Sequence, residues 1–334
     1  MQIKHYTLLG MLSLALCGCK QDTDDNVVSQ SYIHKYGYAI SQEEWEAKSY
    51  PGQVITYLRN GVTVTATYEN DILHGPWTST FPSSQIVQEY CLYNQGTKVK
   101  EVLYAPTGMP VIEKVQLSES RIATTLWYED GVPMQIEEHN GDELVQGQYL
   151  TPTNEVESRV AKGKGMRMLR DAKGELLAKE IVEEGYAVKR ESFYPNGTPE
   201  SIASCHQGTL NGEKKSFAPT GEPIAIEHYA NNQLHGKAIY YNNGNKYLEV
   251  NYRFDQKNGL EKHFTDGNIL SQETYWEAGA QHGPSIFYVE NKKRTEWFYA
   301  GKNVSRAQFE ELHELDVMIS HASPNAADFE NASR

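Results

Sequence analysis

The sequence has few cysteines, few basic side chains and only one long apolar run. Its 334 residues include 4 cysteines, and 31 lysines and arginines stand against 44 aspartates and glutamates, a formal net charge of −13. This acidic balance argues against nucleic-acid binding, because neutralising a phosphate backbone requires a basic surface. No later segment approaches the roughly 20 apolar residues that a membrane-spanning helix needs. The chain beyond its apolar run is therefore expected to stay on one side of any membrane.

The apolar run at the start is typical of a secretory signal. It covers residues 7–16, which is about the length of a signal's apolar region and too short to cross ~30 Å of hydrocarbon. It ends in Leu16-Cys17-Gly18-Cys19, which resembles the lipobox of bacterial lipoproteins and implies acylation, typically palmitate, at Cys19. Cys17 would follow Leu16, where signal peptidases need a small residue, so Cys19 is preferred. An ordinary signal peptide that happens to carry two cysteines is the alternative.

The lipobox resemblance predicts how the N-terminus is organised. Residues 1–18 are expected to be a cleaved signal peptide and residues 19–31 a flexible tether, since the stretch after Cys19 is polar and has no apolar periodicity. A lipoprotein anchor carries more than one acyl chain, which is enough for stable membrane attachment. Lys20 stands where inner-membrane lipoproteins often carry aspartate, so a cell-envelope lipoprotein of the outer membrane is favoured over one of the inner membrane.

Glycine and aromatic residues recur through the chain with a period of about 23 residues. One glycine series has spacings of 24, 23 and 24 residues: Gly212, Gly236, Gly259 and Gly283. A second series runs in step with it: Gly197, Gly221, Gly244 and Gly267. Two aromatic series keep the same period: Phe217, Tyr241, Phe264 and Tyr288, and then Tyr229, Tyr252, Tyr275 and Tyr299. Followed backwards, the pattern gives about eleven units over residues 51–304.

Each unit is expected to be a β-hairpin. Asn-Gly and Asp-Gly pairs, which favour type I′ turns because both central residues need φ > 0, separate short β-prone runs: Asn60-Gly61, Asp130-Gly131, Asn196-Gly197, Asn243-Gly244 and Asp266-Gly267. One hairpin cannot bury enough surface alone, whereas stacked hairpins can. The predicted fold is therefore all-β, an elongated repeat array of stacked antiparallel β-hairpins.

Short helices are expected to cap both ends of this array. Ser41-x-x-Glu44 and Ser305-x-x-Gln308 are capping boxes, which begin helices. Residues 32–50 are accordingly predicted to form an N-terminal cap and residues 305–319 a C-terminal capping helix, because the ends of a repeat array need shielding. The polar residues 320–334 are predicted to be a disordered tail.

The units resemble a known repeat family. Three joints between units read Leu73-His74-Gly75, Leu234-His235-Gly236 and Gln281-His282-Gly283, and the units have the form Tyr-Asn-Asn-Gly244…Tyr252…Asn258-Gly259. These features resemble the variant of the MORN (membrane occupation and recognition nexus) repeat over about residues 51–304. The resemblance implies a non-catalytic repeat protein, and bacterial members are often labelled antitoxin components of toxin–antitoxin systems.

The remaining polar motifs favour structural roles, with no metal, cofactor or catalytic site expected. His74, His235 and His282 occupy one repeat position, and two units apart means about 20 Å, too far for one ion. Cys91 and Cys205 lie five units apart and are expected to be free, buried thiols. A basic cluster could be a solvated sheet face or, as the less favoured alternative, a phosphate or lipid-headgroup patch: Lys162, Lys164, Arg167, Arg170 and Lys173.

Aromatic residues of the last units are the expected binding surface. Neighbours such as Tyr240 and Tyr241, or Tyr275 and Trp276, should point to opposite faces of the sheet, so one member of each pair would join Trp297 in an exposed stripe. The alternative is that both faces are covered, one of them by lysine and glutamate stems. The favoured function is a tethered scaffold for a protein or glycan partner, followed by an antitoxin-like neutraliser of an exported toxin and, last, an envelope glycan-active enzyme.

Overall fold

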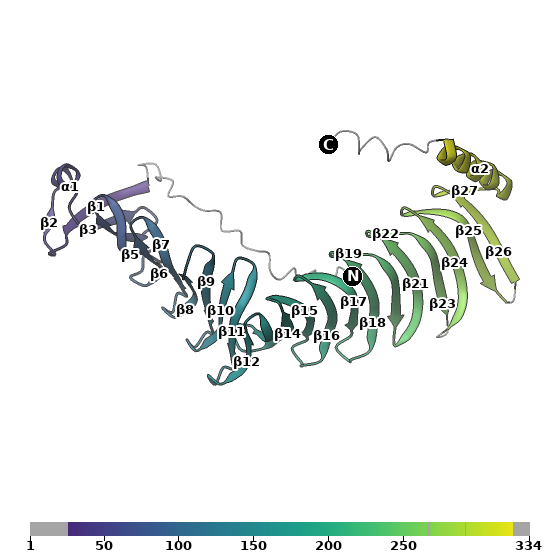
Figure 1. Cartoon of the computed structure of the whole chain (residues 1–334), viewed down its shortest axis with the longest axis horizontal. Helices are drawn as coiled ribbons and strands as arrows, with labels where there is room; N and C mark the ends of the chain where they lie inside the picture. Colours follow the sequence, from purple (N-terminus) through teal and green to yellow (C-terminus); the bar gives the residue numbers. More distant parts are fainter. Residues whose placement is uncertain (1–25, 266–267, 291, 323–334) are drawn as a thin grey trace. The chain divides into compact units, whose positions relative to one another are not determined.

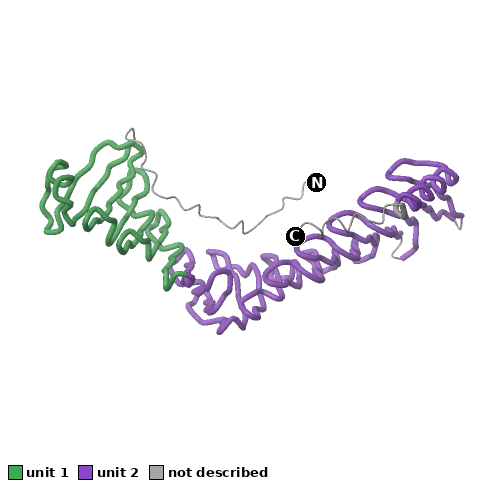
Figure 2. Tube along the Cα trace, turned by 45° about the horizontal axis from the view of Figure 1, so that its top comes forward, with its two compact units in different colours: residues 1–119 green, residues 120–334 purple. Residues whose placement is uncertain are grey.

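A computed structural model describes residues 26–265, 268–290 and 292–322. Nearly every element in this part of the chain is a β-strand paired antiparallel with the next (Figure 1). The chain divides after Glu119 into two compact units, which are described separately (Figure 2). The predicted all-β array of stacked antiparallel hairpins is confirmed, because strands pair with sequence neighbours throughout each unit.

The first unit is a short meander that begins with a helix-bearing hairpin. Strand β1 pairs with both β2 and β3, and β3 to β8 then pair in chain order. The elements are β1 (Val27–His34), β2 (Ala39–Ile40), α1 (Gln42–Lys48), β3 (Gly52–Leu58), β4 (Thr63–Glu69), β5 (Ile72–Thr80), β6 (Val87–Asn94), β7 (Thr97–Tyr104) and β8 (Pro110–Gln116).

The second unit continues the hairpin pattern and ends in a helix. Two of its strands, β19 and β22, have only two residues each, so β18 also pairs with β20 and β21 with β23. The elements are β9 (Arg121–Trp127), β10 (Pro133–Asn140), β11 (Glu143–Leu150), β12 (Val156–Ala161), β13 (Lys164–Arg170), β14 (Leu176–Glu183), β15 (Tyr186–Phe193), β16 (Pro199–His206), β17 (Thr209–Phe217), β18 (Pro223–Ala230), β19 (Gln233–Leu234), β20 (Gly236–Asn242), β21 (Asn245–Arg253), β22 (Gln256–Lys257), β23 (Gly259–Thr265), β24 (Ile269–Glu277), β25 (Ala280–Val289), β26 (Lys292–Tyr299), β27 (Lys302–Val304) and α2 (Arg306–Ala322).

Strand β1 corrects the predicted tether. Residues 27–31 were expected to be flexible, yet the strand begins at Val27 and pairs with β3 from Val27↔Leu58 to His34↔Gly52. The physical reason is that β1 satisfies backbone groups of β3 that would otherwise lie on an open sheet edge. The predicted signal peptide, Cys19 and the remaining tether residues before Asn26 lie outside the described residues.

Both capping helices form at the predicted serines. Ser41 Oγ accepts a hydrogen bond from Glu44 N at 3.1 Å. At the second helix the box is reciprocal, because Gln308 N donates to Ser305 Oγ at 3.2 Å and Ser305 N donates to Gln308 Oε1 at 3.0 Å. Helix α2 extends to Ala322, three residues past the predicted end and into the segment predicted to be disordered. Residues 323–334 of that segment are outside the described part.

Two kinds of turn connect the strands, which corrects the prediction of type I′ turns at every Asn-Gly and Asp-Gly pair. Asn243-Gly244 does have both φ values positive, at 49° and 75°. At Asn60-Gly61, Asp130-Gly131 and Asn196-Gly197 only the glycine does. At these three turns the loop is one residue longer and consists of a type I turn followed by a glycine in the left-handed conformation. The side-chain oxygen of the Asn or Asp accepts a hydrogen bond from the backbone N–H two residues later. Asp266-Gly267 lies outside the described residues.

The core of the second unit contains a cluster of Leu144, Tyr149, Val160 and Val182 and, farther along the chain, a narrow column of mostly small side chains, one from each of the longer strands. The members of the column from β18 to β25 are at most 5% exposed: Ala225, Ala238, Val250, Glu261, Thr274 and Ser285. Cross-strand pairing places Ala238 opposite Val250 and Thr274 opposite both Glu261 and Ser285. The sheet face that carries this column is called the column face below, and the other is called the opposite face. Figure 1 shows these strands bowed along their length.

Candidate functional surface

The five predicted binding residues divide between the two faces of the sheet. Strand alternation places Tyr240 on the column face beside Ala238, and Trp276 on that face across from Gly259. Tyr241 and Tyr275 are therefore on the opposite face, and so is Trp297, which pairs with Pro284 next to the column residue Ser285. Tyr275 is 42% exposed, and the other four are half-buried.

The column-face tyrosines are fixed by a carboxylate. Tyr240 OH donates to Glu227 Oε1 at 3.1 Å, and Tyr229 OH donates to Glu227 Oε2 at 3.0 Å. Burial first, and then the nearby Glu227 charge, raise the pKa of both phenols above the ordinary value. The Trp276 ring also has an internal partner, because Lys257 Nζ lies 4.6 Å from its ring centroid. These rings are internal contacts of the array.

Trp297 belongs to the C-terminal cap. The Phe309 ring of helix α2 lies 5.2 Å from it, and the Arg306 guanidinium lies 5.7 Å from its ring centroid. Tyr299, two residues along the same strand, donates from its OH to Asp316 Oδ2 at 2.7 Å. Helix α2 thus packs over the aromatic side chains of β26 on the opposite face. The predicted exposed stripe therefore ends before β26, leaving Tyr241 and Tyr275 as its members.

Ion pairs accompany Tyr241 and Tyr275 on the opposite face. Glu249 contacts Lys237 at 3.0 Å and Lys246 at 2.7 Å. Burial acts to raise the pKa of Glu249, but hydrogen bonds from the two lysines outweigh it and leave the pKa below the ordinary value. On the next hairpin Tyr288 OH donates to Glu273 Oε2 at 2.6 Å. Lysine and glutamate side chains therefore share this face with the tyrosines, as in the alternative prediction, while Tyr275 remains 42% exposed.

One member of the basic cluster, Arg167, belongs to a buried ion network. Arg167 contacts Glu137 Oε1 at 2.8 Å and Glu180 Oε2 at 2.7 Å, while Arg190 Nε donates to Glu180 Oε1 at 2.6 Å. Tyr149 OH donates to Glu137 Oε1 at 2.6 Å. Glu180 and Tyr149 have no exposed surface. Four charged side chains from strands β10, β13, β14 and β15 thus neutralise one another within the sheet.

At Arg167 the network contradicts both predictions for the basic cluster, namely a solvated sheet face and a phosphate or lipid-headgroup patch. The Arg167 side chain is 22% exposed. Burial acts to lower the pKa of Arg167, but the charges of Glu137 and Glu180 outweigh it and leave the pKa above the ordinary value. Arg170 is also paired, with Glu157 Oε1 at 2.6 Å. The two arginines that would give a phosphate patch its bidentate contacts are therefore already neutralised. Sequence reasoning missed this because Glu137 comes from β10, 30 positions from Arg167, and the pairing of Arg167 with Glu180 depends on strand register.

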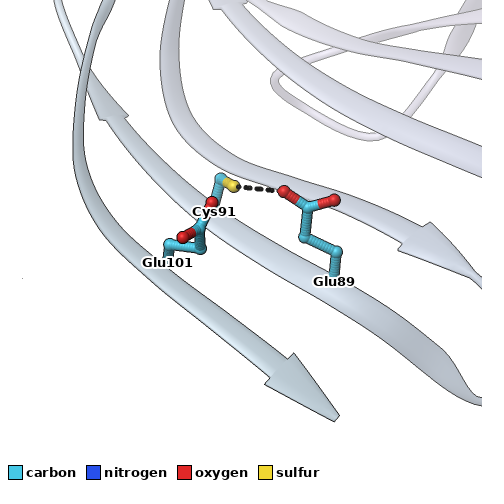
Figure 3. Close-up of side chains that lie close together, drawn as sticks. All are labelled: Glu89, Cys91 and Glu101. Carbon is cyan, nitrogen blue, oxygen red and sulfur yellow. Dashed lines mark hydrogen bonds between the residues drawn. The ribbon is translucent and has the colours of Figure 1, made fainter. Parts of the chain in front are cut away.

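Cys91 and Cys205 are free thiols, as predicted. Cys91 is fully buried, whereas Cys205 is half-buried. Figure 3 shows Cys91 beside Glu89 and Glu101, and the thiol donates to Glu89 Oε1 over 3.3 Å. Burial, and then the hydrogen bond to Glu89, raise the pKa of the Cys91 thiol to about 12.

The potential ligand atoms of Glu89, Cys91 and Glu101 lie within 4.8 Å of one another. Glu101 also forms an ion pair with Lys98. The protonated thiol and this ion pair satisfy the three side chains through protein contacts.

The three repeat-position histidines lie at kinks within or between strands. Each precedes a glycine whose φ is about 100°, a left-handed value that bends the strand. His235 packs on Phe254 at 4.7 Å, and His282 packs on Tyr299 at 5.0 Å and Phe309 at 5.3 Å. His74 lies 3.6 Å from Glu69. Each ring thus has its own local partners, which fits the predicted structural role.

No helix among the described residues combines the length and apolarity needed to span a membrane.

Comparison with known proteins yields no family. No protein-family model matches the chain, and no curated protein matches it. Two solved structures, described as "Crystal Structure of TcdB2-TccC3 without hypervariable C-terminal region" and "Crystal Structure of TcdB2-TccC3-Cdc42", are each 12% identical to this chain, with TM-scores of 0.19 and 0.15. The matches cover 79% and 73% of this chain but only 18% and 19% of those chains. Similarity at this level carries no argument about function.

Proposed function

We propose that the protein is a lipid-anchored scaffold of the cell envelope, in which a non-catalytic hairpin array binds a protein or glycan partner. The observation that carries the proposal is the opposite face of strands β20–β24. That face carries Tyr241, which pairs with Lys246 across β20 and β21, the ion pairs of Glu249 with Lys237 and Lys246, and, on β24, the exposed Tyr275. Aromatic rings beside ordered polar side chains are typical of contact surfaces, and repeat arrays bind along such faces.

The anchor in this proposal rests on the sequence. Leu16-Cys17-Gly18-Cys19 supports acylation at Cys19, and Lys20 supports the outer membrane as the destination. An array beginning at Val27 would leave seven residues, 20–26, between lipid and first strand. Fully extended, such a linker reaches about 25 Å, so the first unit would work close to the membrane surface.

The test is partner capture by crosslinking with the full chain in its membrane. Tyr275→Ser should abolish capture while changing thermal unfolding little, because 42% of this residue is exposed. Tyr57→Ser is the matched control, since Tyr57 is 43% exposed but lies in the first unit. Undiminished capture by the Tyr275→Ser variant, or equal loss with Tyr57→Ser, would place the partner elsewhere and contradict the proposal.

An antitoxin-like role is the second candidate, supported by the resemblance to the MORN-repeat variant. Such a protein would bind a toxin through the same face, but an exported antitoxin can meet only an exported toxin. An envelope glycan-active enzyme is the third. It would need two carboxylates facing one cleft. Among the described residues the buried carboxylates Glu137 and Glu180 are paired with arginines, and the buried Glu261 contacts Lys257 and His263. The scaffold therefore remains the favoured proposal.

A further inference from the structure

Two glutamates and a cysteine converge on one face of the first unit's sheet. Glu89 and Cys91 are two residues apart on β6, so strand alternation places their side chains on the same face. Cross-strand pairing puts Glu101 of β7 directly opposite Cys91. The thiol sulfur and one carboxylate oxygen of each glutamate all lie within 4.8 Å of one another (Figure 3). Three side chains that can ligate a metal therefore meet at one point.

The spacing of these three donor atoms is close to the spacing that one metal ion requires. With metal–ligand bonds of about 2.0–2.3 Å, the donor atoms of a tetrahedral site lie roughly 3.3–3.6 Å apart. Cys91 Sγ is already 3.3 Å from Glu89 Oε1. Rotation of the glutamate side chains closes the remaining gap, while the pairing of β6 with β7 fixes the backbone that carries all three residues. The ligands can therefore reach one ion without moving a strand.

The surroundings of the cluster favour a cation. Cys91 has no exposed surface, and charges interact more strongly where water is excluded. Glu101 is paired with Lys98. Glu89 has no ion pair in the described part of the chain, and its carboxylate accepts a hydrogen bond from the thiol. Lys114 lies across from Glu101 on β8 but pairs with neither glutamate in that same part. A carboxylate beside a buried thiol thus lacks a cationic partner.

The donor set also selects the metal. Magnesium and calcium bind oxygen ligands and do not use a thiolate, and copper(I) prefers sulfur to carboxylate. One thiolate with two carboxylates suits a borderline divalent cation such as zinc. The incoming ion would release the thiol proton to solvent and displace the Lys98 ammonium, whose side chain is 41% exposed and can turn into water.

We propose that Glu89, Cys91 and Glu101 bind a zinc ion, with water at the fourth tetrahedral position. The ion would link β6 to β7 and stabilise the first unit, because a ligand that binds only the folded chain adds its binding free energy to folding. No local motif indicates this site, since Glu101 joins the other two residues only through strand register. The site goes beyond the proposed function and does not involve the β20–β24 face.

The test is titration of the reduced full chain, in detergent, with cobalt(II) and then with zinc(II). A thiolate bound to cobalt gives a sulfur-to-metal charge-transfer band in the near ultraviolet, and one equivalent of zinc per chain should abolish that band. We expect zinc to bind with a Kd below about 10 μM near neutral pH.

The pH dependence of binding gives a second measurement. The pKa of the Cys91 thiol is about 12, so the thiol is protonated before zinc binds and each bound ion releases one proton. The apparent association constant should therefore rise about tenfold per pH unit between about pH 6 and pH 8. An association constant that does not change with pH would show that the thiol is not a ligand and would overturn the inference.

Two variants with matched controls assign the ligands. Cys91→Ala should remove the cobalt band, whereas Cys205→Ala, which removes the other free thiol of the described chain, should leave it unchanged. Glu89→Gln should weaken zinc binding at least about tenfold, because losing even a hydrogen-bond partner of a ligand costs about 10–100-fold. Glu113→Gln is its control, since Glu113 is a half-buried glutamate of β8 that pairs with Lys100, and should bind zinc like the wild type.

The inference would be overturned if the wild type gives no sulfur-to-cobalt band, or if the band survives in the Cys91→Ala protein. Zinc binding by the Glu89→Gln protein that is as tight as in the wild type would also overturn it, because the thiol would then act without the carboxylate. None of these outcomes bears on partner capture by the β20–β24 face, which has its own test.

Discussion

Removing the guanidinium of Arg167 should locally destabilise strands β10–β15. In the folded chain Arg167 contacts Glu137 at 2.8 Å and Glu180 at 2.7 Å, and both carboxylates are almost completely buried. Arg167→Met keeps the stem but leaves Glu137 without a cation. Breaking a buried pair from one side costs about 3–5 kcal/mol. Arg190 still contacts Glu180 in this variant, and Arg167 is 22% exposed in the wild type. We therefore expect the free energy of unfolding to fall by about 3 kcal/mol, the lower end of this range.

Arg294→Met is the control for this prediction. Arg294 pairs with Glu296 at 3.1 Å, but it is 72% exposed, and such a surface pair contributes less than about 1 kcal/mol. Hydrogen–deuterium exchange read by mass spectrometry is the suitable assay, because a repeat array opens locally and a single unfolding midpoint would average over its hairpins. Protection should fall in β13 and β14 of the Arg167→Met protein. Equal, small effects of the two variants would refute the account of the network as a buried ion cluster.

Three further predictions follow from the anchor, the buried thiol and a strained glycine. Cys19→Ser should abolish lipid labelling and signal processing, whereas Cys17→Ser should leave both intact; normal acylation of the first variant would exclude the assignment. The pKa of the Cys91 thiol is about 12 in the folded chain and has an ordinary value of 9.0. The thiol's contribution to stability is therefore complete below pH 9 and is lost as the pH rises toward 12. Cys91→Ala should flatten the fall of the thermal midpoint over that range, and identical slopes for the variant and the wild type would contradict the prediction. Gly165→Ala should lower stability by at least 1–2 kcal/mol (order of magnitude), because the added Cβ would overlap the Arg159 carbonyl oxygen; an unchanged urea midpoint would show that the strand can shift freely.

The local features of the fold could be predicted because short-range chemistry specifies them. The repeat period, the hairpins and both capping serines depend on side chains within a few residues of one another, as Ser41 and Glu44 illustrate. The type of each turn was harder to predict from the sequence. Asn60-Gly61 and Asn243-Gly244 share the same dipeptide, yet only the second is a two-residue type I′ turn. Loop length, which depends on the register of the flanking strands, decides between them.

The candidate sites depended much more on tertiary structure. The sequence alone determined that the chain is a hairpin array with aromatic residues at repeated positions, because period and alternation are properties of neighbouring residues. Only the folded chain brought Glu137 within hydrogen-bonding distance of Arg167, 30 positions away, and packed Phe309 against Trp297. It likewise placed Glu101 opposite Cys91 across two strands. Pairing register and the course of the final helix set these contacts, and both arise from packing summed over many residues, which no local motif encodes.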